Sequence, residues 1–590
     1  MLNKGGMISP KKLPEIIFNK KNHPLLIIVG VFFFVSLALL KLSDIFQVSE
    51  AREGSVVKAI LKDHNWILPL RSSFALPSKP LLFHWIGATF ANIAGSYDEF
   101  LLRFPSLLAG LGTLLSVSIY ARRIGGNNAG LFAPAILSTM YGFSRMSSDG
   151  RVDMLFCFFL TTATLYGLKG VNEKITSRER YIIGILMGLA TLSKGPIGII
   201  VPLVVILASR LSLKGFSAWK EVIGFELLLS FVIAAPWYYL AYLQVGDIFV
   251  DRQLIFENVE RFFGGEGIAE KSSWFYFIHI FGQGAPWSIL FFIYLFFLGR
   301  DSYIKGQGIN RNNRFLPGDK KVSQAIINCL LWFGVLLLAL TLSAGKRRAY
   351  LLLCLPSIAL ILAFRFSTAL EQFGGTHALV GLIRKHRYHL LTWGILIIMI
   401  GLVPGITLFG VGTPDSLIKI WPIVGAAVST LKAVSIRGGW TLIILFSFLS
   451  ASTIGLWIWG MTKQNPKLLG YSIVLFLNLT ITLYTQTGLS FKSVTHSYKR
   501  IGYRLATVIK PDKTLTIVKK PSDESFDVLL FYYGRGVDLF DPGRLPKKPG
   551  LYLVRKNWLD ANPNPHFTVV FTETRPSDDE GEEVVLMYVS

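Results

Sequence analysis

The chain has 590 residues, of which 52% are hydrophobic and 16% charged, and it carries a formal net charge of +24 at pH 7. Many apolar runs reach the roughly 20 residues that a helix needs to cross a bilayer, which excludes a string of water-soluble domains. The basic residues are spread through the loops between these runs. The charge therefore favours an anionic lipid surface as partner and argues against nucleic acid.

The apolar runs predict an α-helical polytopic membrane protein with about thirteen transmembrane helices. Gly195-Pro196 predicts a break that divides one long apolar stretch into two short helices at a bilayer face. The expected spans are 24–42, 99–122, 128–144, 152–170, 180–195, 196–211, 222–242, 280–299, 324–344, 349–366, 389–411, 439–461 and 467–487.

Lysines and arginines in the loops predict the orientation. The thirteen-span arrangement places the basic loops on one side together with the basic N-terminus, and the positive-inside rule makes that side cytoplasmic. The external side receives the loops 43–98, 243–279 and 412–438 and the residues after the last span. We therefore expect a transmembrane domain over 1–490 and a soluble external domain over 491–590.

The external loop 43–98 contains an apolar stripe at helical spacing. Val56, Val57, Ile60 and Leu61 would share one face of a helix. Such a face predicts a helix that lies in the plane of the membrane surface.

The residues after 491 change from long apolar runs to short β-rich runs separated by turn residues. This pattern predicts a small α/β domain outside the membrane. We expect a helix over roughly 496–510 and strands at 514–518, 527–533, 551–554, 567–571 and 584–589.

Acidic residues stand at two places beside expected spans, where ionisable groups are costly and usually paired or functional. Glu50 and Glu53 flank Arg52 just after the first span, and Asp153 opens an apolar helix. An acid at a membrane-edge cavity can serve as a general base. The alternatives are a solvated helix start with local ion pairing and an acid favoured by the helix dipole.

Cations lie on the same external side. They are Lys79, Lys194 and the trio Lys346-Arg347-Arg348, the last against the positive-inside rule. Cations so placed can neutralise a phosphate at the membrane surface, whereas each alone could snorkel to lipid headgroups. Together with the acids they predict group transfer from a lipid phosphate.

At these residues the sequence resembles the GT-C membrane glycosyltransferases, over roughly residues 24–365. It is most similar to the group that holds the lipid A aminoarabinose transferase and the bacterial relatives of protein O-mannosyltransferases, glycosyltransferase families 39 and 83. The segments that carry the resemblance, in order, are Ser78-Lys79-Pro80, Arg103-Phe104-Pro105-Ser106, Arg151-Val152-Asp153-Met154, Ser193-Lys194-Gly195-Pro196, Ala235-Pro236-Trp237, Glu257-Asn258-Val259-Glu260-Arg261 and Ser343-Ala344-Gly345-Lys346-Arg347-Arg348-Ala349-Tyr350.

The resemblance implies a GT-C fold, a polyprenyl-phosphate sugar as donor, inversion at the anomeric carbon and an active site at the external face of a bacterial inner membrane. It implies that Glu50 and Asp153 are the essential acids. It also implies a set of ligands for the donor phosphate (Lys79, Lys346, Arg347 and Arg52) and a set that lines the substrate cavity (Lys194, Glu257, Arg261 and Tyr350).

Two departures from the family pattern affect the chemistry. The first acid of its usual Asp-Glu pair is Ser49 here, so a base role falls to Glu50, to Asp153 or to no residue. Metal-ligating positions of the aminoarabinose enzymes hold Ser78 and Asn258, so no metal or other cofactor is predicted. The three cysteines, Cys157, Cys329 and Cys354, lie inside apolar runs and are expected to be small core residues.

We therefore expect an inverting glycosyltransferase, as a monomer, that moves one sugar to a lipid A or other cell-envelope glycolipid through an acceptor hydroxyl or phosphate. A protein acceptor, as in the protein O-mannosyltransferases, is the alternative within this chemistry. A lipid-linked sugar transporter would typically show repeated halves, which the sequence lacks. An inactive homologue is the further alternative, motivated by Ser49.

Overall fold

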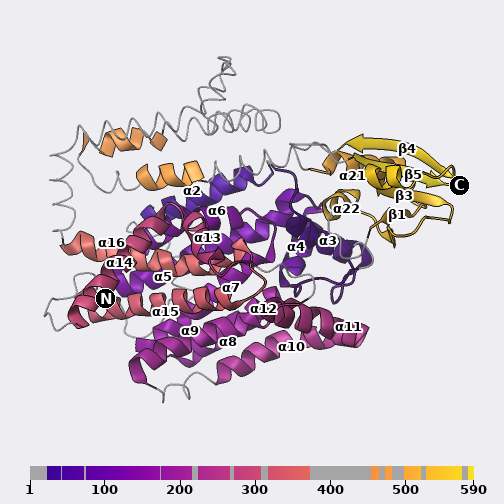
Figure 1. Ribbon diagram of the computed structural model, residues 1–590. Coiled ribbons are helices and arrows are strands. Elements are labelled where there is room, and N and C mark those ends of the chain that lie inside the picture. Colours follow the sequence, from indigo (N-terminus) through magenta and orange to yellow (C-terminus); the bar gives the residue numbers. More distant parts are fainter. Residues whose placement is uncertain are drawn as a thin grey trace.

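The computed structural model shows a bundle of helices with a β-sheet at one end (Figure 1). The expected spans 389–411, 439–461 and 467–487 lie wholly or partly outside the described residues, as does the loop 412–438. The structure describes residues 23–41, 43–71, 75–172, 175–215, 224–265, 271–306, 317–372, 452–453, 455–460, 462–463, 472–481, 497–519, 526–574 and 583–590.

The first part of the chain forms α2 (His23–Leu39), α3 (Val48–Asp63), α4 (Leu82–Ala94), α5 (Glu99–Ser138) and α6 (Tyr141–Met146). The spans predicted at 99–122 and 128–144 both fall largely in α5, which is interrupted by non-helical backbone at Gly125 and Gly126. Gly126 has a φ of 78°, a conformation that favours glycine. The predicted boundary between the two spans is confirmed as this break.

The interfacial helix predicted in the loop 43–98 is present as α3, but its apolar stripe faces protein. Val57 and Ile60 are buried against Ala88 of α4. Gly87 of α4 permits this close packing, because a Cβ there would lie 3.2 Å from Val57. The apolar stripe is therefore accounted for by packing on protein, and the placement of α3 in the plane of the membrane surface stays a prediction.

Four helices follow: α7 (Val152–Asn172), α8 (Ser177–Lys194), α9 (Ile197–Lys214) and α10 (Phe225–Val245). The break predicted at Gly195-Pro196 is confirmed, since α8 ends and α9 begins there. Gly195 has a φ of 109°, which a residue with a side chain rarely adopts.

The next segments are α11 (Asp247–Phe249), the π-helix η4 (Val250–Glu260), α12 (Arg261–Phe263), α13 (Phe275–Gln283), α14 (Trp287–Gly306), α15 (Lys320–Leu342), the 3-10 helix η5 (Arg348–Cys354) and α16 (Leu355–Gln372). The span predicted at 280–299 is divided between α13 and α14. Pro286 just precedes α14, and it lacks the N–H that a continuous helix would need there.

The protein is a multi-pass helical membrane protein. Among the described residues, five helical segments are long and apolar enough to span a bilayer: Glu99–Ser138, Val152–Lys169, Phe225–Val245, Lys320–Leu342 and Arg348–Gln372. The outer face of α10 exposes Leu228, Phe231 and Val232. An apolar face of this kind suits contact with lipid.

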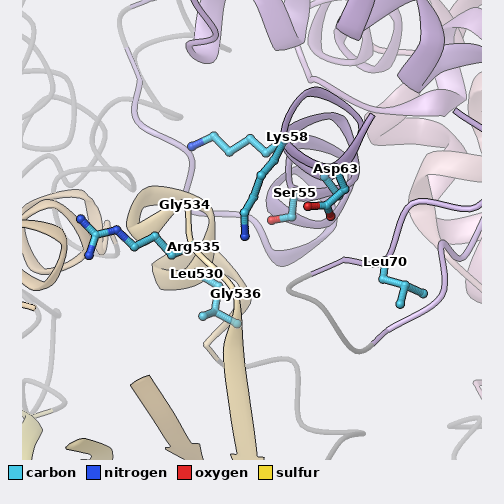
Figure 2. Close-up of a pocket in the computed structure, with 10 residues that line it drawn as sticks. Ser55, Lys58, Asp63, Leu70, Leu530, Gly534, Arg535 and Gly536 are labelled. Atoms are coloured by element: carbon cyan, nitrogen blue, oxygen red, sulfur yellow. The ribbon is translucent and has the colours of Figure 1, made fainter. Parts of the chain in front are cut away.

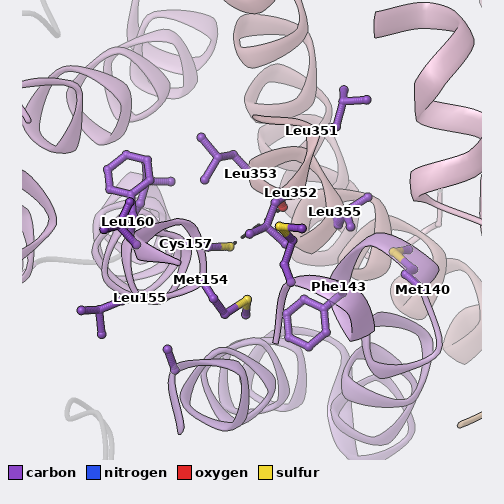
Figure 3. Packing of buried hydrophobic residues seen from close by; sticks show 14 of the residues in the cluster. Met140, Phe143, Met154, Leu155, Cys157, Leu160, Leu351, Leu352, Leu353 and Leu355 are labelled. Atoms are coloured by element: carbon purple, nitrogen blue, oxygen red, sulfur yellow. Dashed lines mark hydrogen bonds between the residues drawn. The ribbon is translucent and has the colours of Figure 1, made fainter. Parts of the chain in front are cut away.

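The core holds η5 and α16 against α7. Figure 3 shows leucines of η5 together with Met154, Leu155 and Cys157 of α7. The Cys157 thiol lies 3.9 Å from the Leu352 carbonyl oxygen. This packing fixes the start of η5 beside the start of α7. The expectation of small core cysteines is confirmed, since all three are buried.

The C-terminal segments form a five-stranded sheet in the order β2-β1-β3-β5-β4. Strand β1 is parallel to β2 and β3, whereas β5 is antiparallel to β3 and β4. The elements are α21 (Lys499–Val508), β1 (Leu515–Val518), α22 (Asp527–Tyr533), β2 (Val537–Phe540), β3 (Gly550–Arg555), α23 (Lys556–Ala561), β4 (Phe567–Thr574) and β5 (Glu583–Val589).

One strand predicted in this region is wrong, because residues 527–533 form the helix α22. All seven residues are buried, and a short apolar run buried on every side does not distinguish a helix from a strand. The other four predicted strands are strands, and β2 was not predicted.

The helix α22 docks on α3. The Phe531 ring packs against Gly54, where a Cβ would lie 2.5 Å from the ring. The Tyr532 hydroxyl accepts a hydrogen bond from the Ile45 backbone N–H and donates one to Glu99. A cavity of about 40 Å³ lies at this junction, and Figure 2 shows Lys58 of α3 near Gly534 at the end of α22.

We predict that Gly54→Ala loosens this contact. The added methyl group overlaps the buried Phe531 ring, and overpacking of this kind costs about 1–3 kcal/mol. Hydrogen exchange of the α22 amides should become faster. Gly30→Ala in α2 is the matched control, because nothing lies within 4 Å of a Cβ there. Equal α22 exchange in both variants would refute the packing argument.

Candidate active site

Charged side chains from segments far apart in the sequence meet in the helical bundle. We call this set the polar cluster. Its members are the cations Arg52, Lys79, Arg151, Lys194, Arg252, Arg261 and Arg347 and the carboxylates Glu53, Asp153 and Glu257.

The start of α7 meets the end of α8 in the polar cluster. Asp153 Oδ1 lies 2.5 Å from Lys194 Nζ, and Asp153 Oδ2 lies 2.8 Å from the Arg151 guanidinium. Lys194 Nζ also lies 4.6 Å from the centre of the Tyr350 ring. The π-face of that ring attracts the ammonium, so η5 closes this side of the cluster.

Glu257 of η4 gathers three cations. Its carboxylate lies 2.6 Å from Lys79 Nζ, 3.0 Å from Arg261 Nε and 3.2 Å from the Arg252 guanidinium. Burial alone would raise the pKa of Glu257, but these cations outweigh it and the pKa is lowered. Glu257 is therefore ionised and holds the three cations together.

Lys79 and Glu257 come together because the loop before α4 crosses η4. The Gln253 side-chain amide of η4 donates a hydrogen bond to the Pro77 carbonyl oxygen. Burial lowers the pKa of Lys79, and the charge of Glu257 opposes this shift only in part. A second negative group beside Lys79 would stabilise its charged form.

Glu53 of α3 pairs with His84 of α4. His84 Nε2 lies 2.7 Å from Glu53 Oε2, and the imidazole is fully buried. Burial would raise the pKa of Glu53, but the hydrogen bond with His84 and the charges of Arg52 and Lys79 leave it lowered. The Glu53 side chain is 9% exposed.

Glu50 lies outside the polar cluster, in a separate buried pair. Its two carboxylate oxygens accept hydrogen bonds from Arg103 of α5, at 2.6 and 3.0 Å. The Gly150 backbone N–H donates to the same carboxylate at 2.9 Å. Arg103 also donates to the carbonyl oxygens of Leu40 and Ser43. This network ties α3, α5 and the segment before α7 into one unit.

Lys346 and Arg347 precede η5 and are held by backbone contacts. The Gly345 N–H donates to the Arg261 carbonyl oxygen, and the Arg347 N–H donates to the Tyr276 hydroxyl. Lys346 Nζ donates to the Ser343 carbonyl oxygen. Within the described part of the chain, no carboxylate pairs with either side-chain cation. The excess of cations over carboxylates makes the polar cluster a place for an anion.

The positions of the family's metal ligands do not fit a metal here. The Asn258 amide nitrogen donates to the Gln253 carbonyl oxygen at 2.6 Å, and the hydroxyl of Ser78 is a poor substitute for a carboxylate ligand. No group of three His, Cys, Asp or Glu side chains at metal-binding distance is found within the described ranges.

The structure brings together Arg52, Lys79, Asp153, Lys194, Glu257, Arg261, Arg347 and Tyr350, and it sets Glu50 apart. Lys346 belongs to the segment that contacts the Arg261 backbone through Ser343 and Gly345, and its ammonium donates to the Ser343 carbonyl oxygen. Sequence reasoning missed Arg252 and His84 as members or neighbours of the polar cluster. The only signal for His84 was an ionisable residue in an apolar helix, four residues after Pro80.

Known proteins match part of this chain in sequence. A family model described as dolichyl-phosphate-mannose-protein mannosyltransferase matches residues 78–239. An undecaprenyl phosphate-alpha-4-amino-4-deoxy-L-arabinose arabinosyl transferase of Shewanella sediminis is 21% identical over 365 residues, which are 60% of this chain and 62% of that protein. A protein of the same description from Pseudomonas aeruginosa strain UCBPP-PA14 is 24% identical over 366 residues, 60% of this chain and 61% of that protein.

The fold matches over almost the whole chain. The crystal structure of ArnT from Cupriavidus metallidurans bound to undecaprenyl phosphate has a TM-score of 0.67 at 15% identity, over 95% of this chain and 97% of that one. The chain has the ArnT fold. The sequence matches cover about three-fifths of the length of the two aminoarabinose transferases. The match therefore shows that the polar cluster lies in a known fold. The activity has to be inferred from the residues of the cluster.

Proposed function

We propose that the protein is an inverting glycosyltransferase of the bacterial inner membrane, which takes a single sugar from a polyprenyl-phosphate donor. The acceptor is a lipid A or another cell-envelope glycolipid at the periplasmic face. The proposal keeps the thirteen-span topology, with a cytoplasmic N-terminus and a periplasmic C-terminal α/β domain. It is also supported by the names of the two aminoarabinose transferases, which include an undecaprenyl phosphate-linked sugar.

The observation that carries the proposal is the excess of cations in the polar cluster. The Lys346 ammonium donates to a backbone carbonyl oxygen, and the Arg347 guanidinium pairs with no carboxylate in the described part of the chain. Lys79 is nearly buried against Glu257. Around a phosphate that binds beside them, these fixed positive charges would take the place of water. As the sugar–phosphate bond breaks, the growing charge on the phosphate oxygens would be stabilised most strongly at this place.

Donor binding should weaken at alkaline pH. Only the charged form of Lys79 binds phosphate strongly, and burial lowers its pKa from the ordinary value of 10.5. Affinity should therefore fall as the pH rises through this lowered pKa, whereas Lys79→Arg should keep its affinity over the same interval. Titration with a polyprenyl monophosphate between about pH 7 and 10 measures this. A pH-independent wild-type affinity would contradict the role of Lys79.

The proposed activity is tested by sugar transfer with the purified protein in lipid nanodiscs. A panel of polyprenyl-phosphate monosaccharides would be offered with membrane lipid extract as acceptor and excess chelator present. We expect consumption of one donor and a labelled lipid product. The lipid extract supplies the envelope glycolipids as acceptors. If no donor in the panel is consumed in its presence, the proposal is overturned.

A protein acceptor is the second candidate. It is favoured by the match of residues 78–239 to the protein mannosyltransferase description. The same donor panel offered with a periplasmic protein extract distinguishes the two candidates. Label in protein and not in lipid would replace the glycolipid acceptor by a protein.

A further inference from the structure

We propose that Glu53 is the general base of the transfer and that His84 positions it, so that the acceptor group is a hydroxyl. This inference rests on the proposed function and assigns the acid whose place Ser49 leaves empty. Glu53 lies four residues, or about one helical turn, after Ser49 on α3. Residues at this spacing share one face of a helix.

Three other carboxylates near the polar cluster have both oxygens occupied. Those of Glu50, Asp153 and Glu257 all contact cations, as described above. A carboxylate bound in this way can accept a proton only if it first gives up a strong charge-assisted contact. Asp149 also has an oxygen without a hydrogen-bond partner, Oδ2, which lies 3.9 Å from Arg145 Nε. Its side chain is only 2% exposed, compared with 9% for Glu53, so an acceptor has less access to it.

Glu53 differs from these three acids. Its Oε2 contacts His84, whereas no hydrogen-bond partner for its Oε1 is found in the described part of the chain. Its side chain is buried but 9% exposed, more than those of Glu50, Asp153 and Glu257, and it interacts electrostatically with Lys79 and Arg151. The available oxygen is therefore within electrostatic range of cations that would hold the phosphate.

His84 fits a positioning role. Its ring is fully buried at the start of α4, and Nδ1 has no hydrogen-bond partner. Because an ionised carboxylate only accepts hydrogen bonds, the proton at this contact belongs to His84 Nε2. The imidazole thus holds Oε2 of Glu53 and leaves Oε1 for the acceptor. A third group orients the catalytic base in the same way in nucleophilic active sites.

The step balances with a hydroxyl acceptor. The hydroxyl oxygen forms a bond to the anomeric carbon while the bond from that carbon to the phosphate oxygen breaks, with its electron pair leaving on the polyprenyl phosphate. The hydroxyl proton passes to Glu53 and then to solvent. A phosphate acceptor would need no base, and a nearby carboxylate would repel it. The lowered pKa of Glu53 keeps it ionised before the reaction.

The test compares Glu53→Gln and Glu53→Asp with Asp63→Asn, an exposed acid at the end of the same helix. We expect Glu53→Gln to lower kcat by about a hundredfold to ten-thousandfold, with binding of a polyprenyl monophosphate within about threefold of wild type. Glu53→Asp should retain part of the activity, and Asp63→Asn all of it. The product should carry the sugar on oxygen of a former hydroxyl.

Two results would overturn the inference. One is a Glu53→Gln enzyme that binds donor and transfers at nearly the wild-type rate, and the other is a product with the sugar on a phosphate. Failure of the proposed function gives a different pattern, because the wild-type protein itself would then transfer no sugar.

His84 is tested separately. His84→Gln keeps a donor near the position of Nε2, whereas His84→Leu removes it. We expect the leucine variant to lose about tenfold to a hundredfold in kcat and the glutamine variant to recover most of this loss. The acid limb of the pH profile should move to higher pH in the leucine variant, because the hydrogen bond that lowers the pKa of Glu53 is gone. An unmoved limb with equal rates in both variants would remove His84 from the assignment.

Discussion

Lys79→Ala should reduce sugar transfer by about a hundredfold to a thousandfold, the loss typical when one preorganised group is removed from a developing charge. Lys79 is held against Glu257 and has little contact with solvent, so its charge acts on the leaving phosphate with little screening. The fold should survive, because Glu257 keeps Arg252 and Arg261. The measurement is kcat/KM with the donor that the panel of polyprenyl-phosphate monosaccharides identifies.

Two variants control this experiment. Lys79→Arg keeps the charge and should retain much more activity than the alanine variant. Lys62→Ala removes an exposed lysine from the last turn of α3, outside the polar cluster, and should leave transfer unchanged. Transfer by Lys79→Ala at a rate within about threefold of wild type would show that Lys79 does not act on the phosphate.

Arg103→Met should unfold or strongly destabilise the protein. Removing the guanidinium leaves Glu50 as a buried charge without its partner, which costs about 3–5 kcal/mol. The carbonyl oxygens of Leu40 and Ser43 also lose their hydrogen bonds. Thermal unfolding in nanodiscs, with the yield of folded protein, measures the effect.

The double variant Arg103→Met with Glu50→Leu should recover part of the lost stability, because no unpaired charge then remains. This expectation changes the role of Glu50. From the sequence, Glu50→Gln would impair transfer with the fold intact, whereas the structure predicts that stability falls as well. If Arg103→Met is stable but inactive, Glu50 has a catalytic role and not only a structural one.

The sequence predicted those features that depend on local signals. The break at Gly195-Pro196 follows from glycine and proline alone, and the strands β3 and β5 follow from β-branched residues between turns. The helix α22 was misread, because its burial on all sides comes from α3 and α21. α3 lies near the other end of the chain and α21 is a separate element, so the local sequence pattern carries no information about either contact.

The candidate site shows the same division. Position beside an apolar run marked Lys79, Asp153 and Lys194 as unusual, and the structure brings them into one cluster. The sequence could not predict that Glu50 pairs with one residue and Glu53 with another. This pairing depends on Arg103 and His84, which stand 53 and 31 residues away from their respective partners.

The most direct test of the account is an experimental structure of the protein in nanodiscs with a polyprenyl monophosphate bound. We expect the phosphate to lie within hydrogen-bond reach of Lys79 and of Lys346 or Arg347, on the side of the cluster where Glu53 presents its available oxygen. A phosphate bound elsewhere, with the polar cluster closed by its own ion pairs, would contradict the proposed site.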